Sequence, residues 1–202
     1  MFKAGALILT LLLILTVQLA AQDSPDVETE WDEYPYDYYA RGDQTFFVNL
    51  GVAFPILFVM DGVVNNSGWK TVGGGGTLIF NYYLLPRLYI GGEVGVMFIG
   101  AQNDTTAFLI PLGARVGTQF IAGRFEFPIA FTVGVSWRRF QTRGHFGFML
   151  KGSASALFRA TAQWAFGLTT SWYFMPEWTR DTGSKNVYGN FLDVTLTARY
   201  HF

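Results

Sequence analysis

The chain contains no cysteine among its 202 residues and has few charged residues, which make up 14% of the sequence. Without cysteine, neither a disulfide scaffold nor thiol-based metal binding can form. Soluble domains carry about 25% Asp, Glu, Lys and Arg, so the surface of this chain is short of charge. The net charge of −1 provides no basic surface for nucleic acid. The composition therefore argues against nucleic-acid partners and against an ordinary water-exposed domain.

The sequence is rich in hydrophobic residues (50%), aromatic residues (18%) and glycine (23 residues). Disordered chains are poor in aromatics and rich in charge, so disorder is excluded for the chain as a whole. The length favours a single domain.

The first segment of the chain is typical of a secretory signal peptide. Lys3 precedes the apolar run from Ala4 to Val17, and small residues follow up to Ala21. A membrane-spanning helix needs about 20 apolar residues, and this run is shorter, so a cleaved signal peptide over 1–21 is the better interpretation.

Residues 22–43 form an acidic leader that is rich in tyrosine. This segment holds eight of the fifteen acidic residues, together with Trp31, Tyr34, Tyr36, Tyr38 and Tyr39. Neither helical nor strand periodicity runs through it, which predicts an extended periplasmic linker. The alternative interpretation is a segment that docks on a partner through its tyrosines.

From residue 44 to residue 202 hydrophobic and small or polar residues alternate. In the segment 124–140, for example, Phe125, Phe127 and Ile129 share one face, while Glu126 and Pro128 lie on the other. Successive side chains of a strand point to opposite faces, and a tilted membrane-spanning strand needs about 9–11 residues. Eight such segments are expected, near 45–54, 70–84, 88–98, 108–120, 124–140, 146–159, 164–174 and 192–202. The fold class is therefore all-β, an eight-stranded antiparallel transmembrane β-barrel.

The chemistry of the two faces indicates which one lies inside. The polar face carries about one charge per strand among Gly, Ala, Ser and Thr, whereas a water-facing surface would be about 25–35% charged. Buried ions need partners, so each acid should have a basic neighbour in a narrow lumen. The expected lumen charge network comprises Glu93, Arg115, Glu126, Arg138, Lys151, Arg159, Asp193 and Arg199. The apolar face has Trp or Tyr near strand ends at Trp69, Tyr82, Trp137, Trp172 and Tyr200, as in the aromatic girdles of membrane barrels.

The connections alternate in length, with longer ones at 54–69, 101–105, 141–144 and 176–188 and tight ones at 84–86, 121–123 and 160–163. Outer-membrane barrels have short periplasmic turns and longer outside loops, so the longer set is expected outside.

These segments resemble the small eight-stranded outer-membrane proteins of the OmpW and OmpX type. The last strand, from Asp193 to Phe202, resembles the C-terminal signal read by the outer-membrane insertion machinery, with Tyr200 and Phe202 at its end. The resemblance implies location in the bacterial outer membrane, with outer-membrane lipid and the insertion machinery as partners. OmpW-like members are associated with passage of small apolar compounds, and OmpX-like members with adhesion.

No constellation of catalytic residues is evident, and neither a cofactor nor a metal is expected. Only two histidines exist, and His145 has no serine close by in sequence to activate. A lipid-modifying enzyme is therefore the less favoured interpretation. The run Gly73–Gly76 lacks the Lys and Ser or Thr of a phosphate-binding loop, and it is expected to let a strand bend at the barrel wall.

The segment from Pro55 to Trp69 is unusually apolar for an exposed loop. Either it extends the first strand, or it folds at the barrel mouth and offers an apolar access site at Leu57, Phe58 and Met60. Two functions follow: a narrow channel or binding barrel for a small apolar solute, or a structural or adhesive surface protein that acts through its extracellular loops.

Overall fold

The computed structural model describes residues 39–60, 63–64, 72–100, 106–140, 143–177 and 187–202. The predicted signal peptide and the leader up to residue 38 lie outside these residues. Among the residues described, the chain has no helix with the length and hydropathy needed to cross a bilayer.

The described chain is almost entirely β-strand. In order along the chain the strands are β1 (Gln44–Met60), β2 (Val63–Val64), β3 (Gly73–Leu85), β4 (Leu88–Gly100), β5 (Thr106–Ala122), β6 (Phe125–Phe140), β7 (Arg143–Arg159), β8 (Trp164–Glu177) and β9 (Val187–His201). The two-residue β2 only extends a hairpin from the end of β1, at the pairs Val59 with Val64 and Met60 with Val63. The other eight strands are 13–17 residues long, long enough to cross a bilayer at a tilt.

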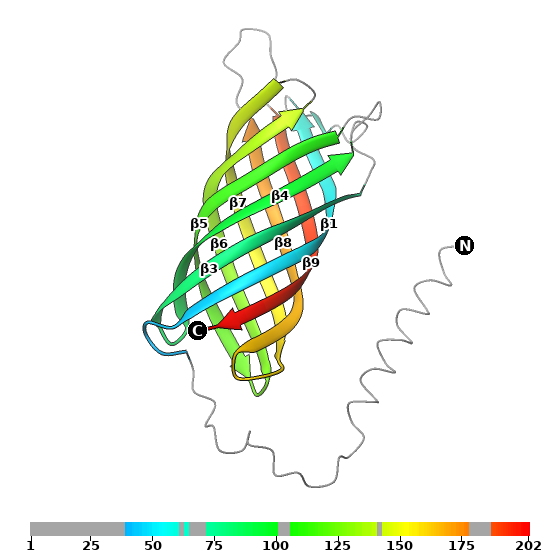
Figure 1. Cartoon of the computed structure of the whole chain (residues 1–202). Coiled ribbons are helices and arrows are strands. Elements are labelled where there is room, and N and C mark those ends of the chain that lie inside the picture. The colour runs from blue at the N-terminus through cyan, green and yellow to red at the C-terminus, as the bar shows by residue number, and fades with distance from the viewer. Residues whose placement is uncertain (1–38, 61–62, 65–71, 101–105, 141–142, 178–186) are drawn as a thin grey trace, which may run out of the picture. The chain divides into compact units, whose positions relative to one another are not determined.

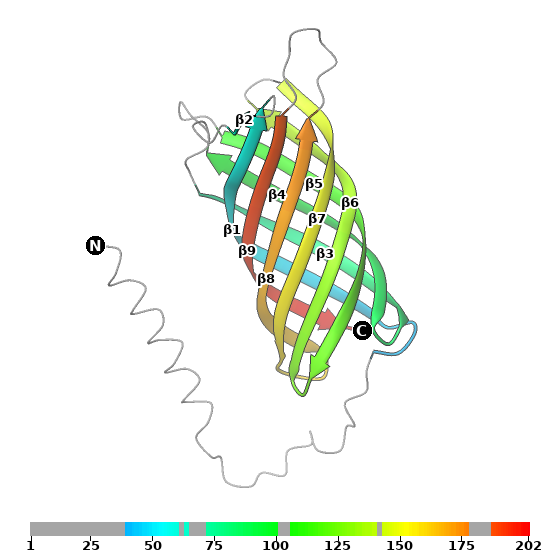
Figure 2. The ribbon, with the colours of Figure 1, turned by 180° about the vertical axis from the view of Figure 1, so that it is seen from behind.

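These eight strands form a closed antiparallel barrel. Each pairs with its neighbours in sequence order, and β1 closes the barrel on β9 from Thr45 opposite His201 to Met60 opposite Val187. Figures 1 and 2 show the tilted strands from opposite sides. Closure pairs the backbone groups of both edges, as a bilayer requires. The predicted eight-stranded antiparallel barrel is confirmed.

One end of the barrel, here called the terminal end, carries the start of β1, the C-terminus and three short turns (Figure 1). The β5–β6 turn consists of two residues, Gly123 and Arg124. Gly123 has a φ of 60°, and two-residue hairpins favour glycine because they need positive φ. The opposite end is called the loop end.

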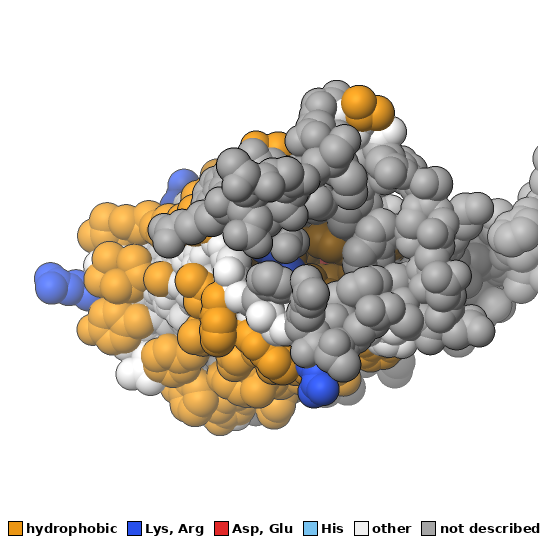
Figure 3. Space-filling view, turned by 90° about the horizontal axis from the view of Figure 1, so that it is seen from above, with side chains coloured by type: hydrophobic (Ala, Val, Ile, Leu, Met, Phe, Trp, Pro, Cys, Tyr) orange, Lys and Arg blue, Asp and Glu red, His pale blue; other side chains and the backbone are white. Residues whose placement is uncertain are grey.

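The outer wall of the barrel is apolar. Seen from the loop end, hydrophobic side chains gather along one side of the wall (Figure 3). The exposed hydrophobic residues of the wall include Leu78, Ile90, Val116, Phe131 and Leu168. The expected girdle residues Tyr82 and Trp172 are exposed, and Trp137 and Tyr200 are half-exposed. Trp69 lies outside the described residues.

The prediction of a connection over 54–69 was wrong in its first part, because β1 continues to Met60. The strand extends past a bulge between Pro55 and Leu57, where the register with β9 shifts by one residue. Proline lacks a backbone N–H, and bulges accommodate it. Likewise β7 begins at Arg143, inside the connection expected over 141–144, and β8 and β9 shorten the expected 176–188 connection.

The glycine run Gly73–Gly76 lies at the start of β3, where the neighbouring strands approach closely. A Cβ atom on Gly75 would lie 2.5 Å from the carbonyl oxygen of Val96, and one on Gly76 would lie 2.8 Å from that of Asn49. Real Cβ atoms essentially never approach so closely, so glycine allows β1, β3 and β4 to pack at this distance.

Candidate functional site

The candidate site is the barrel lumen, which is lined by the charged residues expected there. Glu93, Arg115, Glu126, Lys151, Asp193 and Arg199 are buried, and Arg159 is partly buried. They lie on five strands, β4 to β7 and β9, because each occupies the inward-facing register of its strand. Burying these ions is costly unless each is paired, so their contacts determine whether the lumen is stable.

The cluster nearest the terminal end is centred on Glu126, whose side chain has no exposed surface. Arg199 bonds both carboxylate oxygens, with Nη2 3.0 Å from Oε1. Arg159 Nε donates to Oε1 at 2.6 Å. Such bidentate, charge-assisted bonds are the strong ones, so two guanidinium groups hold one carboxylate.

Neutral donors complete the shell of this carboxylate. Gln119 Nε2 donates to Glu126 Oε2 at 3.1 Å, and Tyr39 donates its hydroxyl to the same oxygen at 3.0 Å. Tyr83 in turn donates to Gln119 Oε1. Tyr39 comes from the leader, and the sequence alone did not place it in the lumen.

A second cluster lies further from the terminal end and is centred on Glu93. Lys151 Nζ lies 3.1 Å from Glu93 Oε1, and Arg115 Nη1 lies 3.5 Å from Oε2. Lys151 also lies over the ring of Tyr173, 4.8 Å from its centroid. One acid and two bases are therefore held together in the middle of the lumen.

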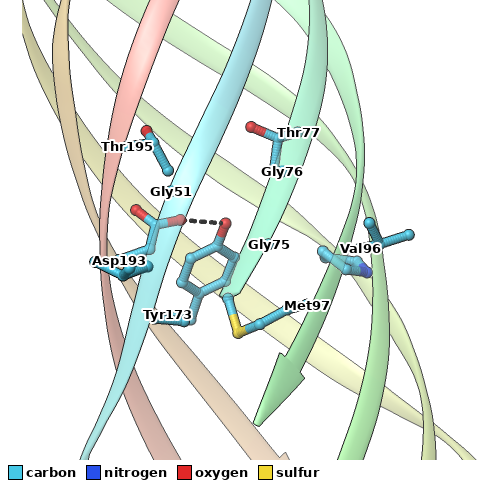
Figure 4. A pocket seen from close by; sticks show the side chains of 12 residues that line it. Gly51, Gly75, Gly76, Thr77, Val96, Met97, Tyr173, Asp193 and Thr195 are labelled. Carbon is cyan, nitrogen blue, oxygen red and sulfur yellow. Dashed lines mark hydrogen bonds between the residues drawn. The ribbon is translucent and has the colours of Figure 1, made fainter. Parts of the chain in front are cut away.

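Asp193 differs from the expectation that every acid pairs with a base. The hydroxyl of Tyr173 donates to its Oδ2 at 3.0 Å (Figure 4), and no ion pair within 4 Å involves Asp193 in the described part of the chain. Tyr173 lies on β8, which pairs with β9, and its phenol therefore reaches the carboxylate of Asp193. A neutral donor thus serves Asp193.

Arg138, the eighth expected member, stands apart from both clusters. It is half-buried near the loop end and donates from Nη2 to the carbonyl oxygen of Pro176 at 3.0 Å. The eight expected lumen charges therefore comprise two clusters of three residues each, together with Asp193 beside Tyr173 and Arg138 near the loop end.

The loop-end half of the lumen is filled by apolar side chains. A buried cluster there comprises Ala53, Met97, Ile99, Ala107, Leu109, Met149, Tyr173, Met175 and Phe191. Hydroxyl and amide pairs fill the region between the charge clusters, including Asn49 to Thr77 at 3.0 Å and Thr169 to Thr197 at 2.6 Å.

The lumen cavity that the described residues line is small. The cavity lined by Gly51, Gly75, Thr77, Tyr173, Asp193 and Thr195 (Figure 4) has a volume of about 10 Å³. That is room for a single water molecule. An eight-stranded barrel has an interior just wide enough for side chains, and here the side chains occupy it.

The outer wall bears an open apolar groove over the same glycines. It has a volume of about 620 Å³ and is lined by Leu50, Leu78, Val94 and Phe98, with Gly74–Gly76 at its floor. Gly51, Gly75 and Gly76 border both the groove and the inner cavity. At these glycines the groove and the inner cavity are separated by the strand backbone, without a side chain.

Of the expected access site, the structure describes the side chain of Leu57 only. Leu57 is half-buried in β1, opposite Asn190, whose side chain donates to the Leu57 carbonyl oxygen at 3.3 Å. Phe58 and Met60 belong to the same strand, and their side chains lie outside the described residues. Of the two interpretations of this segment, residues 56–60 follow the strand extension.

The terminal strand ends in an aromatic group on the outer wall. The ring of Tyr200 packs edge-on against Trp164, with centroids 5.0 Å apart, and against Phe202 at 4.9 Å. The next residue, His201, faces the opposite side of the wall, with Nε2 3.1 Å from Asp43 Oδ2. His145 has its backbone in β7, and its side chain is not described.

Comparisons with known proteins agree with this architecture. The chain is 22% identical over 178 residues to an uncharacterised protein of Treponema pallidum, covering 83% of this chain and 80% of the relative. Its fold matches Neisserial surface protein A with a TM-score of 0.60 at 11% identity, covering 80% of this chain and 99% of the other. The outer membrane protein OprG from Pseudomonas aeruginosa matches with a TM-score of 0.54 at 10% identity, covering 83% and 99%.

A protein-family model matches residues 23–200, nearly all of the chain beyond the first segment. Since this model covers more than half of the chain, the chain belongs to the family that the model describes. Its fold is that of OprG and Neisserial surface protein A, an eight-stranded β-barrel of the bacterial outer-membrane type.

Proposed function

We propose that the protein works in the bacterial outer membrane as a closed structural or surface barrel, acting through the segments at its loop end rather than as an end-to-end channel. The observation that supports this proposal is the filled lumen. Two ion clusters and an apolar cluster follow one another along it, and the cavity described above holds about 10 Å³. A water-filled channel needs about 16–18 strands.

The orientation follows from the connections. The three short turns and the C-terminus lie at the terminal end, and outer-membrane barrels keep short turns on the periplasmic side. We infer that the terminal end faces the periplasm, which leaves the loop end outside the cell, where a surface partner would bind.

The test is conductance and solute uptake in liposomes that contain the refolded protein. We expect neither to exceed that of empty liposomes, while a general porin reconstituted in parallel shows both. A steady conductance from the purified protein would contradict the closed-barrel proposal. Heat-modifiable migration on a gel verifies that the barrel in each preparation is folded.

A second candidate function is a binding barrel for a small apolar solute. The supporting observation is the thin glycine wall between the outer groove and the inner cavity. A solute that enters from the loop end past Leu57, Phe58 and Met60 would leave sideways into the bilayer through this wall, without passing the charged clusters. Such a route needs no end-to-end pore.

Replacing Leu57, Phe58 and Met60 with serine tests this second candidate. If the route exists, uptake of an apolar fluorescent solute into liposomes falls in this variant, whereas Val133→Ser, on the outer face of β6, leaves uptake unchanged. If the wild-type protein takes up no apolar solute faster than empty liposomes do, this candidate is wrong and the closed barrel stands.

A further inference from the structure

We propose that the terminal end of the lumen is a docking site for the last residues of the protein's own leader, 39–43, with Tyr39 as the anchoring side chain, and that this docking seals the lumen at that end. The proposal concerns how the lumen is closed, and it holds for either of the functions considered above. Three observations carry it: the burial of Glu126, the contacts of the Tyr39 ring and the backbone of residues 40–43.

The burial of Glu126 requires a cover. This residue is the second of β6 and follows a two-residue turn, so it lies at the rim of the barrel. A carboxylate at a rim would normally meet water, yet Glu126 is fully buried. Tyr39, which is 1% exposed, lies against it and donates the 3.0 Å hydrogen bond. The leader residue therefore supplies part of the cover.

The ring of Tyr39 is held on all sides. It stacks on Tyr83 with a centroid distance of 4.3 Å and an interplanar angle of 8°, and it meets His201 at 4.7 Å. The guanidinium carbons of Arg199 and Arg159 lie 5.2 Å and 5.9 Å from its centroid, within the range of cation–π attraction. Aromatic stacking, cation–π contacts and one hydrogen bond to a charged group thus act on a single side chain.

The backbone after Tyr39 is fixed as well, so the ring is not a chance contact of a free tail. Gly42 N donates to Tyr83 O, and Tyr83 N donates to Asp43 O, each at 2.9 Å. Asp43 Oδ2 accepts from Ala40 N at 2.9 Å and contacts His201 at 3.1 Å. Gly42 has a φ of 102°, a conformation that favours glycine. This turn is therefore held against Tyr83 near the end of β3 and against His201 at the end of β9.

The charges in the mouth explain why a tyrosine suits this site. Two arginines face the carboxylate of Glu126 there. The electron-rich face of an aromatic ring is attracted to their guanidinium groups, and the phenol hydroxyl satisfies a remaining lone pair of the carboxylate. A leucine would provide neither interaction, and an acid would add a further buried charge.

The test uses the absence of cysteine from the chain. Ala165 faces the lumen at the start of β8, is fully buried and lies opposite both Arg159 and Arg199. Ala165→Cys therefore places one thiol beneath the docked leader. Its reaction with a small charged methanethiosulfonate is measured in lipid nanodiscs, where both ends of the barrel are accessible.

We expect the thiol introduced by Ala165→Cys to react slowly when Tyr39 is present. With Tyr39→Ala added, it should react at least about tenfold faster, because removing the cover allows water to enter. Tyr39→Phe, which keeps the ring, should retain most of the protection, and the neighbouring exposed Arg41→Ala should retain all of it. Equal rates with and without the Tyr39→Ala change would overturn the proposal.

A second measurement keeps the proposal testable if the Tyr39→Ala variant does not fold. Tyr39→Cys and Ala40→Cys are compared in otherwise unchanged protein. Docking predicts that the thiol at position 39 reacts more slowly than the one at position 40, which is exposed. Similar rates at both positions would show that the leader is not held in the mouth.

Discussion

Substitution of Glu126 tests most directly whether the lumen charges stabilise the barrel. The carboxylate is fully buried and accepts hydrogen bonds from Tyr39, Gln119, Arg159 and Arg199. Glu126→Ala leaves Arg199, itself fully buried, without its acid. Removing one partner of a buried ion pair costs about 3–5 kcal/mol, so the free energy of unfolding should fall by about that amount.

The measurement is urea unfolding of the refolded protein in lipid vesicles, followed by tryptophan fluorescence and by heat-modifiable migration. Asp43→Ala is the comparison variant, since it breaks a partly exposed contact with His201 and an exposed hydrogen bond from Ala40 N. An exposed ion pair contributes about 0–1 kcal/mol. Combining Glu126→Ala with Arg199→Ala should cost less than the sum of the two single changes, because residues in one network are coupled.

If Glu126→Ala lowers the free energy of unfolding by no more than Asp43→Ala does, the central assumption is wrong. The paired charges would then be tolerated in the lumen without stabilising it, and the stability of the barrel would rest on its apolar clusters and on the strand pairing that closes it.

Two further predictions concern the wall and the C-terminus. Gly75→Val should lower stability and folding yield, because its Cβ atom would lie 2.5 Å from Val96 O, whereas Gly152→Ala, where no atom lies within 4 Å of the added Cβ, should be tolerated; urea unfolding distinguishes the two. Deleting Phe202 should slow insertion by the outer-membrane machinery without changing the lumen, and pulse-chase measurement of heat-modifiable protein checks this. Normal insertion without Phe202 would contradict its role as a signal.

The strand pattern was predictable from the sequence because the backbone itself imposes it. Alternation with a period of two divides each strand into two faces, and Phe131 and Thr132 indeed lie on opposite sides of the wall. The strand boundaries were less predictable where hydrophobic and polar residues do not alternate. The apolar stretch after Phe54 has no polar partner face, so its continuation as β1 depends on pairing with β9, which is distant in sequence.

What the sequence by itself determined is the fold class and the side of the wall on which each charge lies, since both follow from local periodicity. Which charges meet was decided by the tertiary structure. Strand tilt and register bring Glu126 to Arg159 and Arg199, and place Asp193 beside the phenol of Tyr173. The contact of Tyr39 with Glu126, 87 residues away in the chain, likewise exists only once the barrel has closed. The pocket for Tyr39 is built by residues of other strands, so the sequence of the leader alone could not predict it.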